Sequence, residues 1–276
     1  MGFEFTTPAV EKWRLDEFMK IIDEFENAVA DKVHHKFYTG NSYQMILLHI
    51  IGKVLLTSRE VLNLCALGYP DGALSLARNI YEQSVTVFFF EVHRNDADFQ
   101  DYVDDFFLSY ESQLNKNLRA CEKYFPEGKN DELLKENEHI KSKAKRNVAK
   151  DYGWSGFNSF ANLAESIINH QQDNSLRKFL GKQYITYKRA CLSLHAGCMG
   201  NMIRLGSDAN FGKIDTSPSV YGQSLPLGYV ASSLIPIVGT LCKEFGIEGE
   251  MYLKRLNSLA RYYQSQEEGD VVSLSQ

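Results

Sequence analysis

The chain has 276 residues, of which 44% are hydrophobic and 24% charged, and its formal net charge is −5 at pH 7. This composition is ordinary for a soluble globular protein. The negative net charge excludes a uniformly basic protein that binds nucleic acid through its overall charge alone. The five cysteines form no Cys-x-x-Cys pair and their number is odd, so we expect reduced thiols in a cytoplasmic protein.

No segment resembles a targeting or membrane-spanning sequence. Residues 1–13 lack the basic and apolar regions of a signal peptide. The apolar runs 45–56 and 225–242 are interrupted by charged or polar residues, glycine or proline. We therefore expect no contact with a membrane.

Apolar residues recur at helical spacing along most of the chain, and no stretch alternates as a strand would. The pattern predicts an all-α, single-domain bundle of about eight or nine helices. The expected domain covers 1–266, with its core at 41–205 and a flexible tail at 267–276. The expected helices are approximately 6–30, 41–67, 72–94, 98–124, 159–170, 183–205, 225–245 and 249–264. A charged stretch at 127–150 and a polar loop at 206–223 separate some of them.

Local signals support several of these boundaries. Asn41 or the serine after it is suited to cap the helix 41–67, and Gly68 to stop it. The turn that follows is short, so the helices 41–67 and 72–94 are expected to be antiparallel neighbours. A further helical region beginning near residue 173 is expected to be interrupted at Gly181.

The helix 72–94 is apolar almost all round, which is typical of a buried helix. Arg78 interrupts its apolar face, and Glu82 lies four residues later, where the two side chains can pair. A buried charge is costly unless it is paired. This pair is either an ion pair that orders the helix or part of a functional site.

The helix 98–124 carries acidic residues that we interpret mostly as a solvated face: Asp101, Asp104, Asp105 and Glu111. Helical di-metal sites usually include Glu-x-x-His, which this helix lacks, so we expect no metal and no cofactor. Downstream, Lys143, Lys145 and Arg146 belong to a basic run that could contact phosphates. An exposed helix neutralised by upstream glutamates is the favoured interpretation of that run.

The helix 183–205 carries Tyr184, Tyr187, Cys191 and His195 on one face. His195 is either a core residue bonded to a neighbour or a site residue. We predict that Arg78, Glu82 and His195 meet in space, because each buried polar group then satisfies another. The tyrosines at 81, 184 and 187 are candidates for the remaining hydrogen bonds.

The segments Gly68–Ala73 and Arg78-Asn79-Ile80-Tyr81-Glu82 resemble a bacterial all-helical family of unknown function. That family shows an Arg-x-x-x-Glu helix, a Trp-Ser-Gly segment and a tyrosine-rich helix ending in Ser-x-x-x-His. Trp154-Ser155-Gly156, Tyr184, Tyr187 and His195 follow in that order, although Cys191 stands where the pattern has serine. Trp154 is expected either to anchor its loop in the core or to line a pocket.

The spacing of Arg189 and His195 also resembles the Arg-x4–6-His motif of the HEPN superfamily of helical nucleases. This resemblance implies RNA cleavage through 2′-hydroxyl attack, assisted by histidine and arginine. On a regular helix the two residues diverge, so they would converge through local distortion or across a homodimer.

Two functions follow as hypotheses. One is a HEPN-like, metal-independent ribonuclease or toxin-type effector in bacterial defence, with Arg78, Glu82, Arg189 and His195 as catalytic residues and RNA as partner. Its binding residues would be Tyr81, Trp154, Tyr184, Tyr187, Lys143, Lys145 and Arg146. The other is a non-catalytic helical module for a protein partner or small ligand. Nucleotide-binding, serine-hydrolase and zincin motifs are absent.

Overall fold

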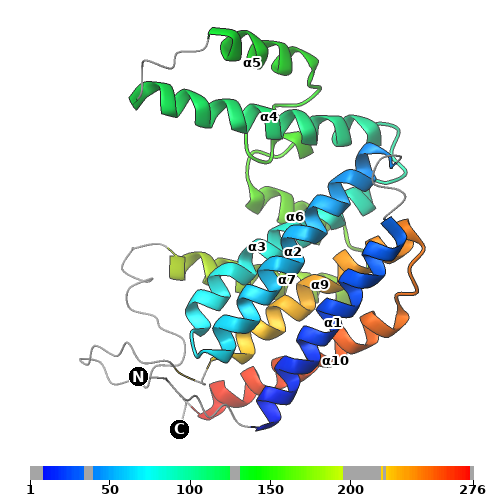
Figure 1. The fold of residues 1–276 in the computed structure, drawn as a ribbon, viewed down its shortest axis with the longest axis vertical. Coiled ribbons are helices and arrows are strands. Elements are labelled where there is room, and N and C mark those ends of the chain that lie inside the picture. The colour runs from blue at the N-terminus through cyan, green and yellow to red at the C-terminus, as the bar shows by residue number, and fades with distance from the viewer. Residues whose placement is uncertain (1–8, 34–39, 125–130, 195–218, 220–221, 274–276) are drawn as a thin grey trace. The chain divides into compact units, whose positions relative to one another are not determined.

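The computed structural model describes residues 9–33, 40–124, 131–194, 219 and 222–273 (Figure 1). Within these ranges the chain forms nine α-helices, one 3-10 turn and no strand. The prediction of an all-α fold is confirmed. The chain packs as two compact units, one of residues 1–87 and 178–276 and the other of residues 88–177. We call them unit 1 and unit 2.

Unit 1 has α9 at its centre. It contains α1 (Ala9–Val33), α2 (Ser42–Ala66), most of α3 (Pro70–Val92), most of α7 (Asn174–Leu194), α9 (Ser224–Phe245) and α10 (Glu250–Ser273). Helix α9 packs along α10 and also contacts α1 and α2. A Cβ atom at Gly228 would lie 3.0 Å from Cβ of Tyr263, so glycine at this position permits the close approach of α9 and α10.

The apolar character of α9 is accounted for by this packing. Its length and hydropathy would suit a membrane span, yet 83% of its 18-residue apolar window is buried inside the fold. The core helix of a soluble protein has the same properties.

Several predicted boundaries are confirmed. The amide of Gln44 donates to Asn41 Oδ1 over 2.9 Å, so Asn41 caps α2. Gly68 and Gly246 follow α2 and α9 with φ of 82° and 66°, a conformation that glycine adopts most readily. Only residues 67–69 connect α2 to α3, and a Cβ atom at Gly72 would lie 3.6 Å from Leu64, as expected for antiparallel neighbours.

Two predicted boundaries were wrong. Helix α7 begins at Asn174 and runs through Gly181 without the expected interruption. A Cβ atom at Gly181 would meet nothing within 4 Å, so this glycine lies at an open surface where the helix passes it at modest cost. Helix α10 continues to Ser273, beyond the predicted end near residue 264.

Unit 2 is built around an aromatic core. It contains the end of α3, α4 (Phe99–Tyr124), α5 (Asp131–Lys143), the 3-10 turn η2 (Gly153–Ser155), α6 (Phe160–His170) and the start of α7. The ring of Trp154 lies 5.4, 5.2 and 5.0 Å from the rings of Phe89, Phe90 and Phe106. Trp154 is 3% exposed. Of the two alternatives, a loop anchor in the core or a pocket wall, it is therefore the loop anchor.

The interpretation of Asp105 as part of a solvated face was wrong, because its side chain is 1% exposed. Its carboxylate accepts from the Lys145 amide over 3.0 Å and from Arg146 Nη1 over 3.2 Å. Arg146 also pairs with Asp98 and lies 3.6 Å from the ring centre of Tyr102. The arginine of the basic run therefore connects that run to α4 within unit 2.

Candidate functional site

Helices α3 and α7 bring four polar side chains together within unit 1. Arg78 Nε lies 3.5 Å from Glu82 Oε1, and Arg78 Nη1 donates to Cys191 Sγ over 3.8 Å. The hydroxyl of Tyr187 donates to Glu82 Oε1 over 3.1 Å. We call these four connected residues the Arg78 cluster.

The cluster follows from helical spacing, since Arg78 and Glu82 are four residues apart on α3 and Tyr187 and Cys191 four apart on α7. The side chains of Arg78 and Glu82 keep 26% and 21% of their surface exposed. The expectation that Arg78 is buried was therefore too strong. Partial exposure weakens the ion pair through solvent screening, and it leaves the charged groups accessible.

The pKa values of Arg78 and Tyr187 are both raised. Burial by itself lowers the pKa of Arg78, but the hydrogen bond to Cys191 and the charge of Glu82 together raise this pKa by more. The net shift is therefore upward. Burial is the main cause that raises the pKa of Tyr187, followed by its interactions with Cys191 and Glu82. At neutral pH Arg78 is a cation and Tyr187 a neutral donor.

Tyrosine rings form one wall of the cluster. The ring centre of Tyr81 lies 5.7 Å from that of Tyr187 and 5.4 Å from that of Tyr229 on α9. Tyr184 stacks on Tyr187 with ring centres 6.1 Å apart, and Lys188 Nζ lies 4.6 Å from the ring of Tyr184. These rings give the site flat apolar surfaces beside its charges.

Besides Arg78 Nε, which makes no hydrogen bond, two buried polar atoms beside this wall have no hydrogen-bond partner: Tyr229 Oη and Gln183 Oε1. Both residues line a hollow of about 10 Å³ between α7, α9 and α10. A space of about this size is close to the minimum for one water molecule. A polar guest would satisfy groups whose isolation otherwise costs free energy.

The arrangement combines a cation, a carboxylate and a hydroxyl donor. Arg78 can bind an anionic group, Glu82 can accept a proton, and Tyr187 can donate a hydrogen bond. These are the components of acid–base chemistry on a phosphate ester, and also of a binding site for a small anion.

The predicted site residues fall into three groups. Arg78 and Glu82 come together with the predicted tyrosines 81, 184 and 187. Arg189 is exposed on α7, whereas His195, predicted to join them, lies outside the described residues. Trp154, Lys143, Lys145 and Arg146 belong to unit 2, where both lysines are exposed.

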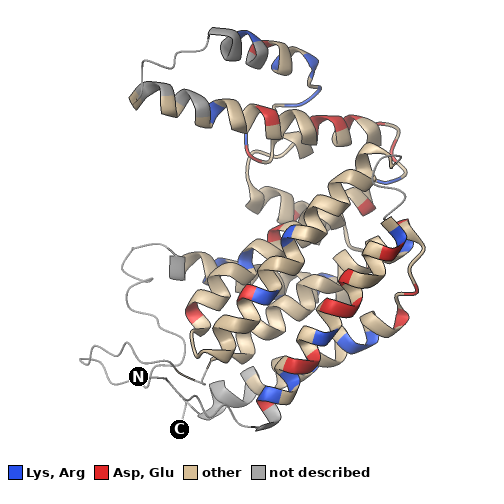
Figure 2. Ribbon diagram, viewed as in Figure 1, with Lys and Arg blue, Asp and Glu red and all other residues tan. Residues whose placement is uncertain are grey.

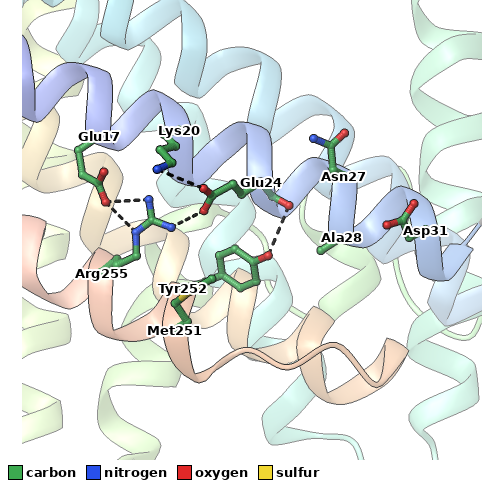
Figure 3. A pocket seen from close by; sticks show the side chains of 9 residues that line it. All are labelled: Glu17, Lys20, Glu24, Asn27, Ala28, Asp31, Met251, Tyr252 and Arg255. Atoms are coloured by element: carbon green, nitrogen blue, oxygen red, sulfur yellow. Dashed lines mark hydrogen bonds and ion pairs between the residues drawn. The ribbon is translucent and has the colours of Figure 1, made fainter.

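A groove of about 620 Å³ runs between α1 and α10, also in unit 1 (Figure 3). Arg255 pairs there with both Glu17 and Glu24, and the hydroxyl of Tyr252 donates to the backbone oxygen of Glu24 over 3.4 Å. Acidic and basic residues are interspersed along both helices (Figure 2). The ion pairs of Arg255 with these two glutamates join α10 to α1, so we favour the Arg78 cluster as the site.

Sequence reasoning missed Tyr229 and Gln183. Tyr229 lies in the apolar run of α9, where the single tyrosine of the helix was the available signal. Gln183 precedes Tyr187 by one turn, but its orphaned oxygen becomes evident only once α9 is in place. Among the described residues, no group of three histidine, cysteine or acidic side chains is placed to hold a metal ion.

Comparison with models of protein families finds one match, over residues 44–213, to a family of unknown function, DUF5677. The match spans the whole Arg78 cluster, whereas Tyr229 and the groove between α1 and α10 lie outside it. No curated protein and no solved structure matches the chain significantly.

Proposed function

The chain belongs to DUF5677, a family of unknown function, and we propose that it is a HEPN-like endoribonuclease that cleaves RNA without a metal ion. Such an activity suits a toxin-type effector in bacterial defence. The observation that supports the proposal is the contact of Arg78 with Glu82, and of Glu82 with Tyr187, at a partly exposed position.

Cleavage of RNA by its own 2′-hydroxyl requires a base, a group that stabilises charge on the phosphate, and an acid for the leaving oxygen. In our proposal Glu82 accepts the 2′-hydroxyl proton as that oxygen attacks phosphorus, and Arg78 binds the phosphate oxygens. The bond to the 5′-oxygen breaks, and His195 gives this oxygen a proton. The products are a 2′,3′-cyclic phosphate and a free 5′-hydroxyl.

Substrate binding would draw on cations near the cluster. Lys188 and Arg189 are exposed on α7, and cations of this kind bind the RNA backbone. Within the tyrosine wall, Tyr187 is the partly exposed ring on which a base can stack. Lys143 and Lys145 on unit 2 are further candidates for phosphate contacts.

The experiment is a cleavage assay of the purified full chain with end-labelled RNAs of varied sequence and structure, in the presence of a chelator. We expect cyclic-phosphate products from RNA and none from the same oligonucleotides with 2′-deoxy sugars. Glu82→Gln and His195→Ala should each lower the rate at least about 100-fold, the usual scale of acid–base catalysis. RNA left intact across the whole panel would overturn the proposal.

Matched controls separate chemistry from folding. Glu60→Gln and His139→Ala change exposed residues of the same types, and both should cleave at the rate of the parent protein. Each variant is checked by its circular dichroism and thermal unfolding, so that loss of activity is scored only for folded protein.

The second candidate is a non-catalytic module that binds a small ligand. The observation that favours it is the partly exposed guanidinium of Arg78, whose Nε has no hydrogen-bond partner. A nucleotide panel monitored by thermal shift tests it. A ligand that raises the melting temperature of the parent protein, but not of Arg78→Met, together with no RNA cleavage, would favour binding over catalysis.

A further inference from the structure

Helix α7 carries positive charge without any negative charge to balance it. Its 21 residues include no aspartate and no glutamate, although the whole chain has a net charge of −5. Its cations are Arg177, Lys178, Lys182, Lys188 and Arg189. Those from Lys178 onward belong to unit 1, and all of these are exposed. A solvent-facing surface with charge of one sign attracts a partner of the opposite sign.

Three of these cations are not neutralised by the rest of the described chain. Arg146 and Arg255, on other helices, each form ion pairs with two carboxylates. In the part of the chain that the structure describes, no carboxylate pairs with Lys178, Lys188 or Arg189. The positive charge of α7 is therefore open to an anion from outside.

The outward side of α7 forms a continuous stripe. Alternating steps of four and three residues place five exposed side chains on this side: Lys178, Lys182, Ile185, Arg189 and Leu192. We call these five residues the α7 stripe. From Lys178 to Arg189 it is about 17 Å long at 1.5 Å per residue. A stacked nucleic-acid strand rises 3.4 Å per nucleotide, so this length faces about five phosphates.

The α7 stripe suits a nucleic-acid strand better than a membrane. A helix that lies in a membrane surface buries its apolar face among the lipids. The apolar face of α7 is instead turned into the fold, where Tyr184 and Ala190 are 7% and 0% exposed. The outward side presents cations, with Ile185 and Leu192 as separate apolar side chains among them. Apolar side chains in this setting can contact bases while the cations hold phosphates.

We propose that the α7 stripe and Lys188 bind the sugar–phosphate backbone of a single-stranded nucleic acid, whatever its sequence. By helical periodicity Lys188 lies between the stripe and the side of α7 that carries Tyr187 and Cys191. A strand on the stripe therefore passes the edge of the Arg78 cluster, where an unpaired base can stack on the partly exposed ring of Tyr187. The inference rests on the proposed function in that it names the substrate as an unpaired strand.

The test measures binding without cleavage, by fluorescence anisotropy of a labelled single-stranded DNA and the full chain at about 50 to 200 mM salt. The parent should bind, and its affinity should fall with salt. Lys178→Gln/Lys188→Gln/Arg189→Gln should bind at least about tenfold more weakly at the lowest salt. The slope of log affinity against log salt should become shallower by about 2, since each single-strand phosphate contact contributes about 0.7. Each single substitution should change the slope by about 0.7.

The matched control is Lys12→Gln/Lys53→Gln/Arg261→Gln, which removes three exposed cations from α1, α2 and α10. It lowers the net charge equally and should bind DNA like the parent, and circular dichroism checks the folding of both variants. A parent that does not bind, or a control as weak as the α7 variant, overturns the inference. So does binding of phosphatidylserine vesicles or an acidic peptide in place of the strand.

The two proposals fail in different ways. If RNA stays intact in the cleavage assay but the parent binds DNA through α7, the proposed catalysis is wrong and the binding surface stands. If RNA is cleaved but the α7 variant binds and cleaves like the parent, the catalysis stands and the binding surface is wrong.

Discussion

Tyr187 on α7 donates a hydrogen bond to Glu82 on α3 over 3.1 Å, although 105 residues separate them in the chain. The same carboxylate oxygen lies 3.5 Å from Arg78 Nε. One oxygen therefore faces a cation and a neutral donor from two different helices. This relationship fixes the direction of the carboxylate and connects α3 to α7.

Replacing Tyr187 with phenylalanine should lower the free energy of unfolding by about 1–2 kcal/mol, since a hydrogen bond to a charged acceptor is lost at a partly exposed place. Urea denaturation measures the change. Tyr69→Phe is the matched control, because Tyr69 is 45% exposed and the substitution should change stability by less than about 0.5 kcal/mol. Equal stability of the two variants would contradict a role for the hydroxyl of Tyr187.

Replacing Arg146 with methionine should destabilise the protein strongly. The substitution leaves the carboxylate of Asp105, which is 1% exposed, without its guanidinium partner, and an unpaired buried charge costs about 3–5 kcal/mol. Lys145→Ala is the control, because Lys145 reaches Asp105 through its backbone amide and the substitution keeps that bond. A loss below about 1 kcal/mol for Arg146→Met, within the range of surface pairs, would show that Asp105 is solvated after all.

Buried thiols should make stability fall in alkaline solution. Burial raises the pKa of Cys242 to about 11, above the value of about 8.5 for a free thiol. The folded protein therefore holds the proton more tightly, so this contribution is complete below about pH 8.5 and is lost as pH rises toward 11.

The measurement is the free energy of unfolding from pH 8 to 11, compared between the parent and Cys242→Ala. The variant should show a shallower decline, by up to about 1.4 kcal/mol per pH unit. Cys121→Ala, which removes an exposed thiol, should keep the slope of the parent. A variant with the parent slope would mean that Cys242 is not the titrating group.

Much of the candidate site was predictable because helical periodicity alone places residues on faces. Arg78 and Glu82 could be paired from their spacing, and Tyr187 could be assigned to the face of α7 that meets them. Helix caps were equally local, as Asn41 and Gly68 show. Each of these features depends on residues within one or two turns.

The features that were not predicted depend on which element covers which face. Asp105 looked solvated because an amphipathic helix usually buries its apolar side, whereas α4 also buries Asp105 and satisfies it with Arg146. Tyr229 joins the tyrosine wall only because α9 packs beside α3 and α7. Gly181 predicted a break in the helix from its residue type alone, but α7 continues through this glycine, which lies at an open surface.

The prediction that His195 joins Arg78 and Glu82 concerns a residue outside the described ranges, and it can be tested in solution. A double-mutant cycle between Glu82→Gln and His195→Ala measures the coupling in the free energy of unfolding. We expect a coupling of about 1–2 kcal/mol, within the range found for residues in contact. The control cycle pairs His195→Ala with Glu60→Gln, an exposed glutamate on α2, and should be additive. If the Glu82 cycle is also additive within about 0.5 kcal/mol, the limit for independent sites, then His195 does not share the site and the proton donor must be sought elsewhere.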